Sequence, residues 1–280
     1  YQLIPGEKEA AGTSFEGHGF FEASSPRKIN EKYYLIYSSS LSHELCYATS
    51  DSPVGGFEYG GTIISIGDVG LSGITTKEQA RNYTGNTHGG LVEINGQWYI
   101  FYLKKCNRQG CAEKIFFKED GSIPQVEITS CGLNDGPLMG VGKYEARVAC
   151  NLFDNEDSFS YDAYMDKNIS THPYFTQTGE DREYDGDQYI ANMRDGAVAG
   201  FKYFDFKEYH PANITVEMKG KAKGKFIVAL DESLSKVAAE IPVEIDSKDY
   251  MSIRAEISLP DEVCPLFFKF TGDGAVDFFS

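Results

Sequence analysis

An internal repeat limits the folds open to this chain more than any other feature of its sequence. Residues 30–37 (NEKYYLIY) and 95–102 (NGQWYIFY) each place a turn before a run of aromatic and aliphatic residues. An Asn-Gly pair is a strong hairpin signal, and runs rich in Tyr, Phe and Ile favour strands. Three pairs of matching residues are each 65 positions apart: Asn30 and Asn95, Tyr37 and Tyr102, and Cys46 and Cys111. The chain therefore holds two copies of one β unit.

Each copy predicts four strands, one before the turn and three after it. The expected strands are residues 19–24, 33–37, 45–49 and 57–64 in the first copy, and residues 85–90, 98–102, 111–115 and 126–129 in the second. Repeated four-stranded sheets indicate a β-propeller, whose ring contains about four to eight blades. Two units cannot close such a ring. Either further blades precede Tyr1, or the fold is not a propeller.

The first strand of each copy carries one titratable side chain. Glu22 precedes Asn30 by eight residues and His88 precedes Asn95 by seven, so the two occupy nearly equivalent positions. The first strand of a propeller blade lines the central channel, and we therefore expect both side chains to face it. A Glu and a His that converge there form a candidate active site. A structural salt-bridged pair is the alternative.

After about Tyr144 the aromatic repeat gives way to short strand patterns separated by Gly, Asp and Pro. Strands are expected at 214–218, 225–230, 239–245, 251–257, 265–270 and 275–279. Such a series of short, alternating strands predicts a β-sandwich. We therefore predict an all-β chain with two domains, residues 1–145 built from the repeat and residues 146–280 forming the sandwich.

Charge and hydropathy narrow the range of partners. The formal net charge is −16 at pH 7, so a nucleic-acid backbone would be repelled, whereas a neutral polysaccharide would not. No apolar run reaches the roughly 18 residues of a membrane span, and we expect no membrane partner. No signal peptide is visible, and the start at Tyr1 indicates a start inside a longer protein or after processing. The compartment stays open, with cytoplasm favoured over secretion.

Cysteine spacing gives no sign of a metal site or a disulfide framework. The six cysteines match no paired zinc spacing and are too sparse for a small disulfide scaffold. We expect ordinary, mostly buried thiols, with disulfides as the alternative. The residues are Cys46, Cys106, Cys111, Cys131, Cys150 and Cys264.

Five motifs fall in order in the first half of the chain. They are FFEAS (20–24), YYLIYS (33–38), CYATSDSP (46–53), NTHGG (86–90) and GQWYIFY (96–102). Together they resemble glycoside hydrolase family 43, which contains five-bladed propellers that act on polysaccharides containing arabinose or xylose. The resemblance covers about residues 10–145 and implies the last two blades of such a propeller.

The resemblance also implies roles for single residues. Family enzymes of this kind are inverting, with a general acid and a general base about 6.5–9.5 Å apart. Glu22 falls where the family carries its acid, and Phe20 and Phe21 would raise the Glu22 pKa by desolvation. His88 matches the family histidine at the channel axis, which often borders a bound calcium ion or a water network. Phe21 and Arg108 fall at expected sugar contacts, although Arg108 could equally be a surface charge on a loop.

The chain departs from the family pattern at two points. The general base of the family comes from its first blade, which would precede Tyr1, and Asp51 and Asp68 lie in turns and are poor substitutes. Leu103-Lys104 also stands where relatives often carry His-Arg. The alternative function is therefore a non-catalytic carbohydrate-binding protein. The preceding blades could equally be a separate chain or a second protomer.

The second half carries three motifs of its own: YIANMRDG (189–196), FKYFDF (201–206) and AVDFF (275–279). They resemble carbohydrate-binding module family 6, a jelly-roll sandwich. The resemblance implies that Tyr184, Tyr189 and Tyr203 stack on sugar rings, with ordinary packing as the alternative. It also implies a structural calcium ion held by Asp277, although Ala149-Cys150-Asn151 replaces the usual partner motif. We expect a pentose-containing oligo- or polysaccharide as ligand and no cofactor for the chemistry.

Overall fold

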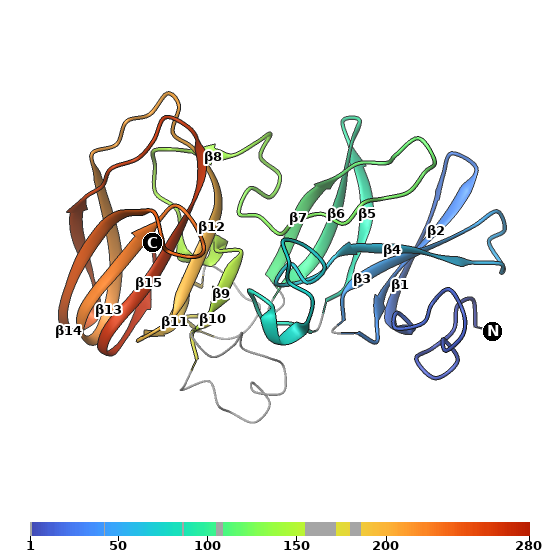
Figure 1. Ribbon diagram of the computed structural model, residues 1–280, viewed down its shortest axis with the longest axis horizontal. Coiled ribbons are helices and arrows are strands. Elements are labelled where there is room, and N and C mark those ends of the chain that lie inside the picture. The colour runs from blue at the N-terminus through green and yellow to red at the C-terminus, as the bar shows by residue number, and fades with distance from the viewer. Residues whose placement is uncertain (1, 42, 86, 105–108, 155–171, 180–185) are drawn as a thin grey trace. The chain divides into compact units, whose positions relative to one another are not determined.

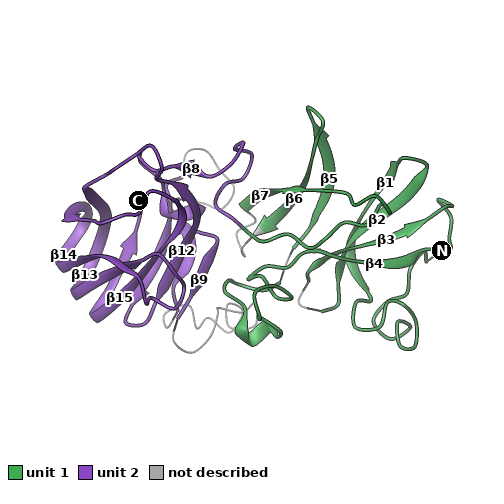
Figure 2. Cartoon of the chain, turned by 45° about the horizontal axis from the view of Figure 1, so that its top comes forward, with its two compact units in different colours: residues 1–128 green, residues 129–280 purple. Residues whose placement is uncertain are grey.

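The computed structural model describes residues 2–41, 43–85, 87–104, 109–154, 172–179 and 186–280 (Figure 1). The regular elements of the described residues are almost all β-strands, which confirms the all-β class, and these residues form two compact units, residues 1–128 and 129–280 (Figure 2). None of the helices in the described part of the chain is both long and apolar enough to cross a membrane. Residues 129–145, which sequence analysis assigns to the first domain, lie with the second unit because β8 (Leu138–Met139) pairs with β12 (Val198–Asp205).

The first repeat forms an antiparallel four-stranded sheet, as predicted. Its strands, in spatial and chain order, are β1 (Phe20–Ile29), β2 (Lys32–Ser39), β3 (Leu45–Ser50) and β4 (Glu58–Ile64). Asn30 and Glu31 join β1 to β2 with φ values of 47° and 65°. A two-residue hairpin turn with both φ values positive matches the right-handed twist of its strands, and Asn is one of the few non-glycine residues that enter this region readily.

Alternation along β2 and β3 buries one set of side chains beneath the N-terminal segment. Leu35, Tyr37, Cys46 and Ala48 share a core with three residues of that segment. The segment residues are Ile4, Ala10 and Phe15. Successive strand residues point to opposite faces, so this pattern places the cluster on one face of the sheet.

The second repeat forms three strands rather than the expected four. They are β5 (Gly89–Ile94), β6 (Gln97–Lys104) and β7 (Gln109–Ile115). The fourth strand expected at 126–129 is wrong, because the backbone of this segment bonds elsewhere. The Val126 N–H donates to the Ile63 carbonyl of β4, and the Ile128 N–H donates to Asp68 Oδ1. The segment therefore returns to the edge of the first sheet. A short 3₁₀ helix, η1 (Lys77–Gln79), lies in the long connection between the two sheets.

The described strands of the second unit form a sandwich and pair antiparallel, except that β8 pairs parallel with β12. Its main sheet has the order β10 (Tyr174–Gln177), β11 (Gln188–Arg194), β15 (Val263–Phe278), β12, β8. In addition, β13 (Asn213–Ala229) pairs with both β14 (Val237–Glu256) and β15, and β9 (Asn151–Phe153) pairs with β12. A 3₁₀ helix, η2 (Ala146–Val148), precedes β9. The predicted jelly-roll sandwich is confirmed at the level of fold class.

The six short strands expected between 214 and 279 merge in pairs into β13, β14 and β15. The residues that separate them in the sequence, such as Gly220 and Gly272, signal turns locally. Here they lie at register shifts or close backbone contacts inside a continuous ladder. Phe226, Phe270 and Phe278 are fully buried between the layers, with Phe226 at ring-centroid distances of 5.4 Å and 5.5 Å from the other two. This aromatic core fixes the sandwich around β13 and β15.

The cysteines of the described residues are free thiols, as expected. Cys46, Cys150 and Cys264 are buried, while Cys111 and Cys131 are partly exposed. Cys106 lies outside the described residues.

Candidate functional site

Glu22 and His88 meet in the structure, as the repeat predicts. Glu22 lies in β1 as expected, whereas His88 lies just before β5 rather than within the strand expected at 85–90. The Leu103 N–H donates to the His88 carbonyl. Glu22 Oε1 and His88 Nε2 are 2.7 Å apart, and the two side chains are 40% and 36% exposed. Two repeat-related sheets therefore bring a carboxyl group and an imidazole into one hydrogen-bonded pair that solvent can reach.

A β-bulge aims the Glu22 side chain. Glu22 pairs with Ser38, and Ser25 pairs with Ile36. Between these two pairs β1 therefore contains one residue more than β2. Ala23, inside this bulge, has a φ of 62°. A bulge bends its strand and redirects side chains, and such features are frequent next to active sites. The bulge inside β1 therefore sets the direction of the Glu22 side chain.

His43 is a third member of this site that sequence analysis missed. It lies in the β2–β3 turn with a φ of 52°, and its ring stacks on Phe21 at a centroid distance of 4.3 Å. Burial lowers the pKa of His43. The charge of Glu22 opposes this shift, whereas His88 adds to it. Glu22 and His88 therefore both lie close enough to act on the His43 ring. The repeat contained the signal, because His43 and Arg108 are also 65 positions apart.

The flanking phenylalanines do not enclose Glu22 as sequence analysis expects. The Phe20 ring packs toward Tyr37 at a centroid distance of 6.1 Å, and Phe21 is 50% exposed against His43. The bulge separates these rings from the carboxyl group that they flank in sequence. Glu22 is consequently an accessible carboxyl group beside an imidazole, which suits proton exchange with a bound molecule.

Asp51 and Asp68 make contacts other than with the pair of Glu22 and His88. The Asp51 side chain is 94% exposed, with Lys32 Nζ 4.0 Å from its Oδ1. Asp68 is buried and accepts the Ile128 N–H at 2.8 Å. The first is a surface charge and the second closes a loop, so we assign neither to the chemistry at Glu22.

Tyr189, one of the three tyrosines expected to stack on sugar rings, lies beside a lysine and a second tyrosine. The Lys219 ammonium lies 5.1 Å from the Tyr189 ring centroid and 4.6 Å from that of Tyr250. Burial raises the pKa of Tyr189 above its ordinary value. Tyr203 is partly buried in β12, with β15 between it and β11, which carries Tyr189. Tyr184 and Arg108 lie outside the described residues.

Asp277 lies in β15 beside Asn192 and Lys219. Its Oδ1 accepts the Asn192 N–H at 3.4 Å, and Lys219 is its paired residue on β13. Burial raises the pKa of Asp277, while the Asn192 bond and the Lys219 charge oppose that rise. Ca²⁺ requires six to eight oxygen ligands, and the structural calcium ion expected at Asp277 stays a prediction.

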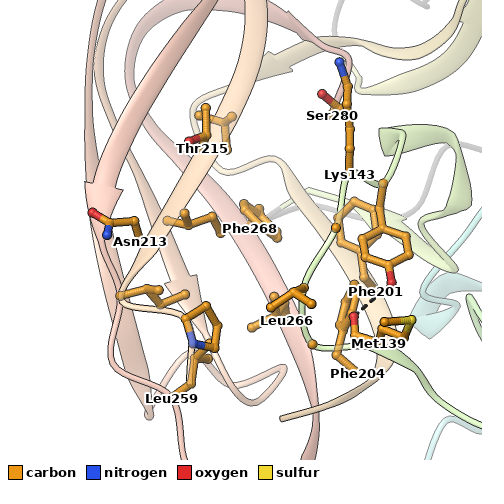
Figure 3. Close-up of a pocket in the computed structure, with 18 of the residues that line it drawn as sticks. Met139, Lys143, Phe201, Phe204, Asn213, Thr215, Leu259, Leu266, Phe268 and Ser280 are labelled. Atoms are coloured by element: carbon orange, nitrogen blue, oxygen red, sulfur yellow. Dashed lines mark hydrogen bonds between the residues drawn. The ribbon is translucent and has the colours of Figure 1, made fainter. Parts of the chain in front are cut away.

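An apolar cavity opens in the second unit and was not predicted. Its volume is about 450 Å³, and its wall includes Phe204, Leu259, Leu266 and Phe268 (Figure 3). Lys143 also lines it and pairs with Glu217, at 2.5 Å between Nζ and Oε2. The lining residues are scattered from Met139 to Ser280, so no single sequence motif indicates the cavity.

Comparison with known proteins finds similarity to glycosidases. No family model matches it. A xylosidase/arabinosidase from Thermoclostridium stercorarium is 46% identical over 284 residues, which cover 98% of this chain and 58% of that protein. A β-xylosidase from Xylanibacter ruminicola is 41% identical over 85 residues, 30% of this chain and 22% of its own length.

A solved structure supports the same fold. A glycoside hydrolase family 43 arabinoxylan arabinofuranohydrolase from Bacillus subtilis aligns with a TM-score of 0.50 and 19% identity, over 93% of this chain and 53% of that one. The chain spans less than two thirds of the length of each of these three proteins. In sequence the chain is similar over nearly its whole length to a xylosidase/arabinosidase, and in fold it is similar to an enzyme of glycoside hydrolase family 43.

Proposed function

We propose that the protein hydrolyses arabinofuranosyl or xylosyl linkages of arabinoxylan or its oligosaccharides with inversion, and that Glu22 is the general acid. The observation that carries this proposal is the 2.7 Å contact between Glu22 Oε1 and His88 Nε2, made by two repeat-related sheets and open to solvent. The names of the related proteins, xylosidase/arabinosidase and β-xylosidase, support the substrate class.

In this proposal each neighbour of Glu22 has a separate task. His88 holds one carboxyl oxygen, which leaves the other free to protonate the leaving-group oxygen of a glycoside. Phe21 stacked on His43 presents a half-exposed aromatic surface beside the carboxyl group. Aromatic faces suit the C–H surface of a sugar, so this stack would orient the pentose.

Inversion requires a second carboxylate about 6.5–9.5 Å from the acid, which activates the attacking water. We assign no such base among the described residues, because Asp51 and Asp68 have contacts of their own. We propose that another blade of the propeller ring supplies it, whether that blade belongs to the same polypeptide, a separate chain or a second protomer.

A second candidate function is carbohydrate binding without cleavage. The lack of an assignable base in the described residues favours it, and the Tyr189–Lys219–Tyr250 group offers aromatic surface on the second unit. Calorimetry with xylo- and arabino-oligosaccharides, run beside a pentose-release assay on the full-length protein, separates the two candidates. Binding without any released pentose would support the binding protein, and release would support the hydrolase.

The test of Glu22 is a Glu22→Gln variant of the full-length protein assayed on two substrates. General acid catalysis contributes about 10²–10⁴-fold, so turnover of arabinoxylan should fall by that factor. The dinitrophenolate group of a dinitrophenyl pentoside leaves without protonation, so hydrolysis of this substrate should be nearly unchanged. Glu31→Gln is the matched control, because Glu31 is on the same blade, is 91% exposed and loses the same charge. Full activity of Glu22→Gln on arabinoxylan would show that another group is the acid.

A further inference from the structure

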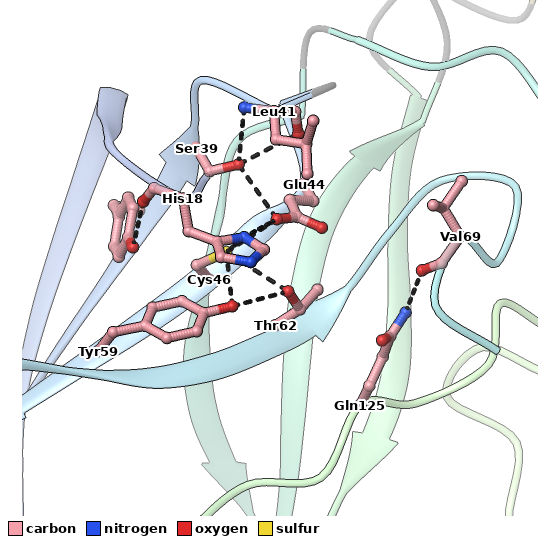
Figure 4. A network of polar contacts seen from close by, with 10 residues as sticks. His18, Ser39, Leu41, Glu44, Cys46, Tyr59, Thr62, Val69 and Gln125 are labelled. Atoms are coloured by element: carbon pink, nitrogen blue, oxygen red, sulfur yellow. Dashed lines mark hydrogen bonds and ion pairs between the residues drawn. The ribbon is translucent and has the colours of Figure 1, made fainter. Parts of the chain in front are cut away.

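A second cluster of reactive side chains lies on the first blade. His18, in the segment that precedes β1, approaches Glu44 and Cys46 at the start of β3 (Figure 4). The Cys46 side chain is buried, Glu44 is 7% exposed, and His18 is 28% exposed. Among the described residues, no other group of three His, Cys, Asp or Glu side chains has the ligand atoms within the 4.8 Å spread found here.

The three side chains offer one ligand atom each to a common point. Glu44 and Cys46 are two positions apart at the start of a strand, so both point to the same face. The separations are 2.6 Å between His18 Nδ1 and Glu44 Oε1, 3.4 Å between Glu44 Oε1 and Cys46 Sγ, and 4.0 Å between Cys46 Sγ and His18 Nδ1. Three kinds of donor from two segments therefore converge within a small volume.

These separations are close to those of a tetrahedral zinc site. Zinc bonds of about 2.0–2.2 Å to N and O and about 2.3 Å to S place N and O about 3.4 Å apart, and S about 3.6 Å from either. The two distances to Cys46 Sγ differ from this value by about 0.2 Å and 0.4 Å. The His18–Glu44 contact must open by about 0.8 Å, and the partly exposed His18 ring can make that movement.

The surrounding residues hold the donors as outer groups of a metal site do. The Ser39 hydroxyl donates to Glu44 Oε1 at 3.3 Å, and the Tyr59 ring stacks on the His18 ring at 4.6 Å with an interplanar angle of 11°. The Thr62 hydroxyl lies 3.6 Å from Cys46 Sγ. Such contacts orient ligands and tune the bound ion. The exposed edge of His18 gives an ion a path from solvent.

The donor chemistry selects the type of ion. A thiolate and an imidazole are poor ligands for Ca²⁺ and Mg²⁺, which prefer oxygen donors, but they suit Zn²⁺. A buried carboxylate beside a buried thiol also needs positive charge nearby, because an uncompensated charge away from water is costly. A divalent cation would neutralise both groups at once.

We propose that His18, Glu44 and Cys46 bind one Zn²⁺ ion, with water in the fourth position. The site is separate from Glu22 and His88, and it does not rest on the proposed hydrolase activity. It would tie the segment before β1 to the start of β3, next to the turn that carries His43. The bound ion would therefore stabilise the blade that presents the candidate active site.

The test uses the full-length protein after a chelator has removed any bound metal. Zn²⁺ binding is then measured by calorimetry, and Co²⁺ binding by absorption spectroscopy. We expect one ion per chain and a thiolate-to-cobalt charge-transfer band. The band should disappear in Cys46→Ser, and His18→Gln should weaken binding at least 10-fold. Ser39→Ala should weaken binding about 10–100-fold by removing an outer hydrogen bond. Circular dichroism checks that each variant is folded, and if Cys46→Ser is not, the partly exposed His18→Gln variant decides.

Two control variants separate this site from other thiols and imidazoles. Cys131→Ser, at a partly exposed thiol of the second unit, and His88→Gln, at the candidate active site, should both leave the band and the affinity unchanged. No charge-transfer band, a band that persists in folded Cys46→Ser, or unchanged affinity in folded His18→Gln would overturn the proposal and leave the cluster as a hydrogen-bonded network. Since Glu22→Gln should bind the metal normally, failure here is distinguishable from failure of the proposed hydrolase function.

Discussion

Replacing Gly224 with Ala tests whether close backbone contact between β13 and β15 determines the shape of the sandwich. Gly224 pairs with Gly272 of β15. A Cβ atom at Gly224 would lie 2.1 Å from the Thr271 carbonyl oxygen and 2.8 Å from the Gly272 Cα. Both neighbours are backbone atoms, and real Cβ contacts essentially never fall under 3.0 Å. The strands would have to separate by about 0.9 Å at this point, judged against close-packed protein interiors.

The expected loss of stability follows from two opposing effects. Forcing an extra methyl group into a packed interior costs about 1–3 kcal/mol. Alanine restricts the unfolded chain more than glycine does, which returns about 0.4–1 kcal/mol. We therefore expect Gly224→Ala to lower the free energy of unfolding by about 1–2 kcal/mol.

The assay is urea unfolding followed by far-UV circular dichroism, with hydrogen exchange of the β13 and β15 backbone as a local measure. Gly110→Ala is the matched control, because Gly110 lies in strand β7 and a Cβ atom there meets nothing within 4 Å. The control should change stability by no more than about 0.5 kcal/mol. If Gly224→Ala is as stable as the wild type, or matches Gly110→Ala, the contact argument is refuted.

Two further predictions concern pH. Burial lowers the pKa of His43, so below about pH 6.5 the unfolded chain binds more protons than the folded chain, and stability falls as the pH drops. His43→Gln should reduce this fall, measured as the difference between urea midpoints at about pH 7.5 and pH 5.5, and an unchanged difference would contradict it. Burial raises the pKa of Asp277, so the folded chain binds more protons above about pH 3.9 and stability is lost as the pH rises. Asp277→Asn keeps an acceptor for the Asn192 N–H and should be more stable than the wild type at pH 7 but equal to it near pH 3; lower stability at pH 7 would show that the charge is compensated.

The blade and the convergence of Glu22 with His88 could be predicted because their signals are local or repeated. The turn residues Asn30 and Asn95 adopt positive φ values, and aromatic strands follow both of them. Once two sequence units are equivalent, matching positions must lie at matching places in their sheets. The same offset also relates His43 to Arg108, so His43 was within reach of sequence reasoning.

The failures share one cause, which is that strand partners are chosen across the fold. The segment at 126–129 has a strand-like sequence, but its N–H groups bond to Ile63 and Asp68 rather than to β7. Gly220 and Gly272 read as turns, yet they lie within strands whose neighbours continue the ladder. A backbone hydrogen bond requires a partner, and local sequence does not name that partner.

By itself, the sequence determined the all-β class, the two repeated units, the hairpin turns and the positions of Glu22 and His88 within those units. Only the tertiary structure decided that the His43 ring stacks on Phe21 and that three long strands replace the six short ones expected. It also brought His18 to Glu44 and Cys46, which lie 26 and 28 positions further along the chain. The first group depends on side-chain alternation and turn geometry, which act over a few residues. The second depends on which distant segments pack together, because burial and hydrogen bonding are satisfied by the whole chain at once.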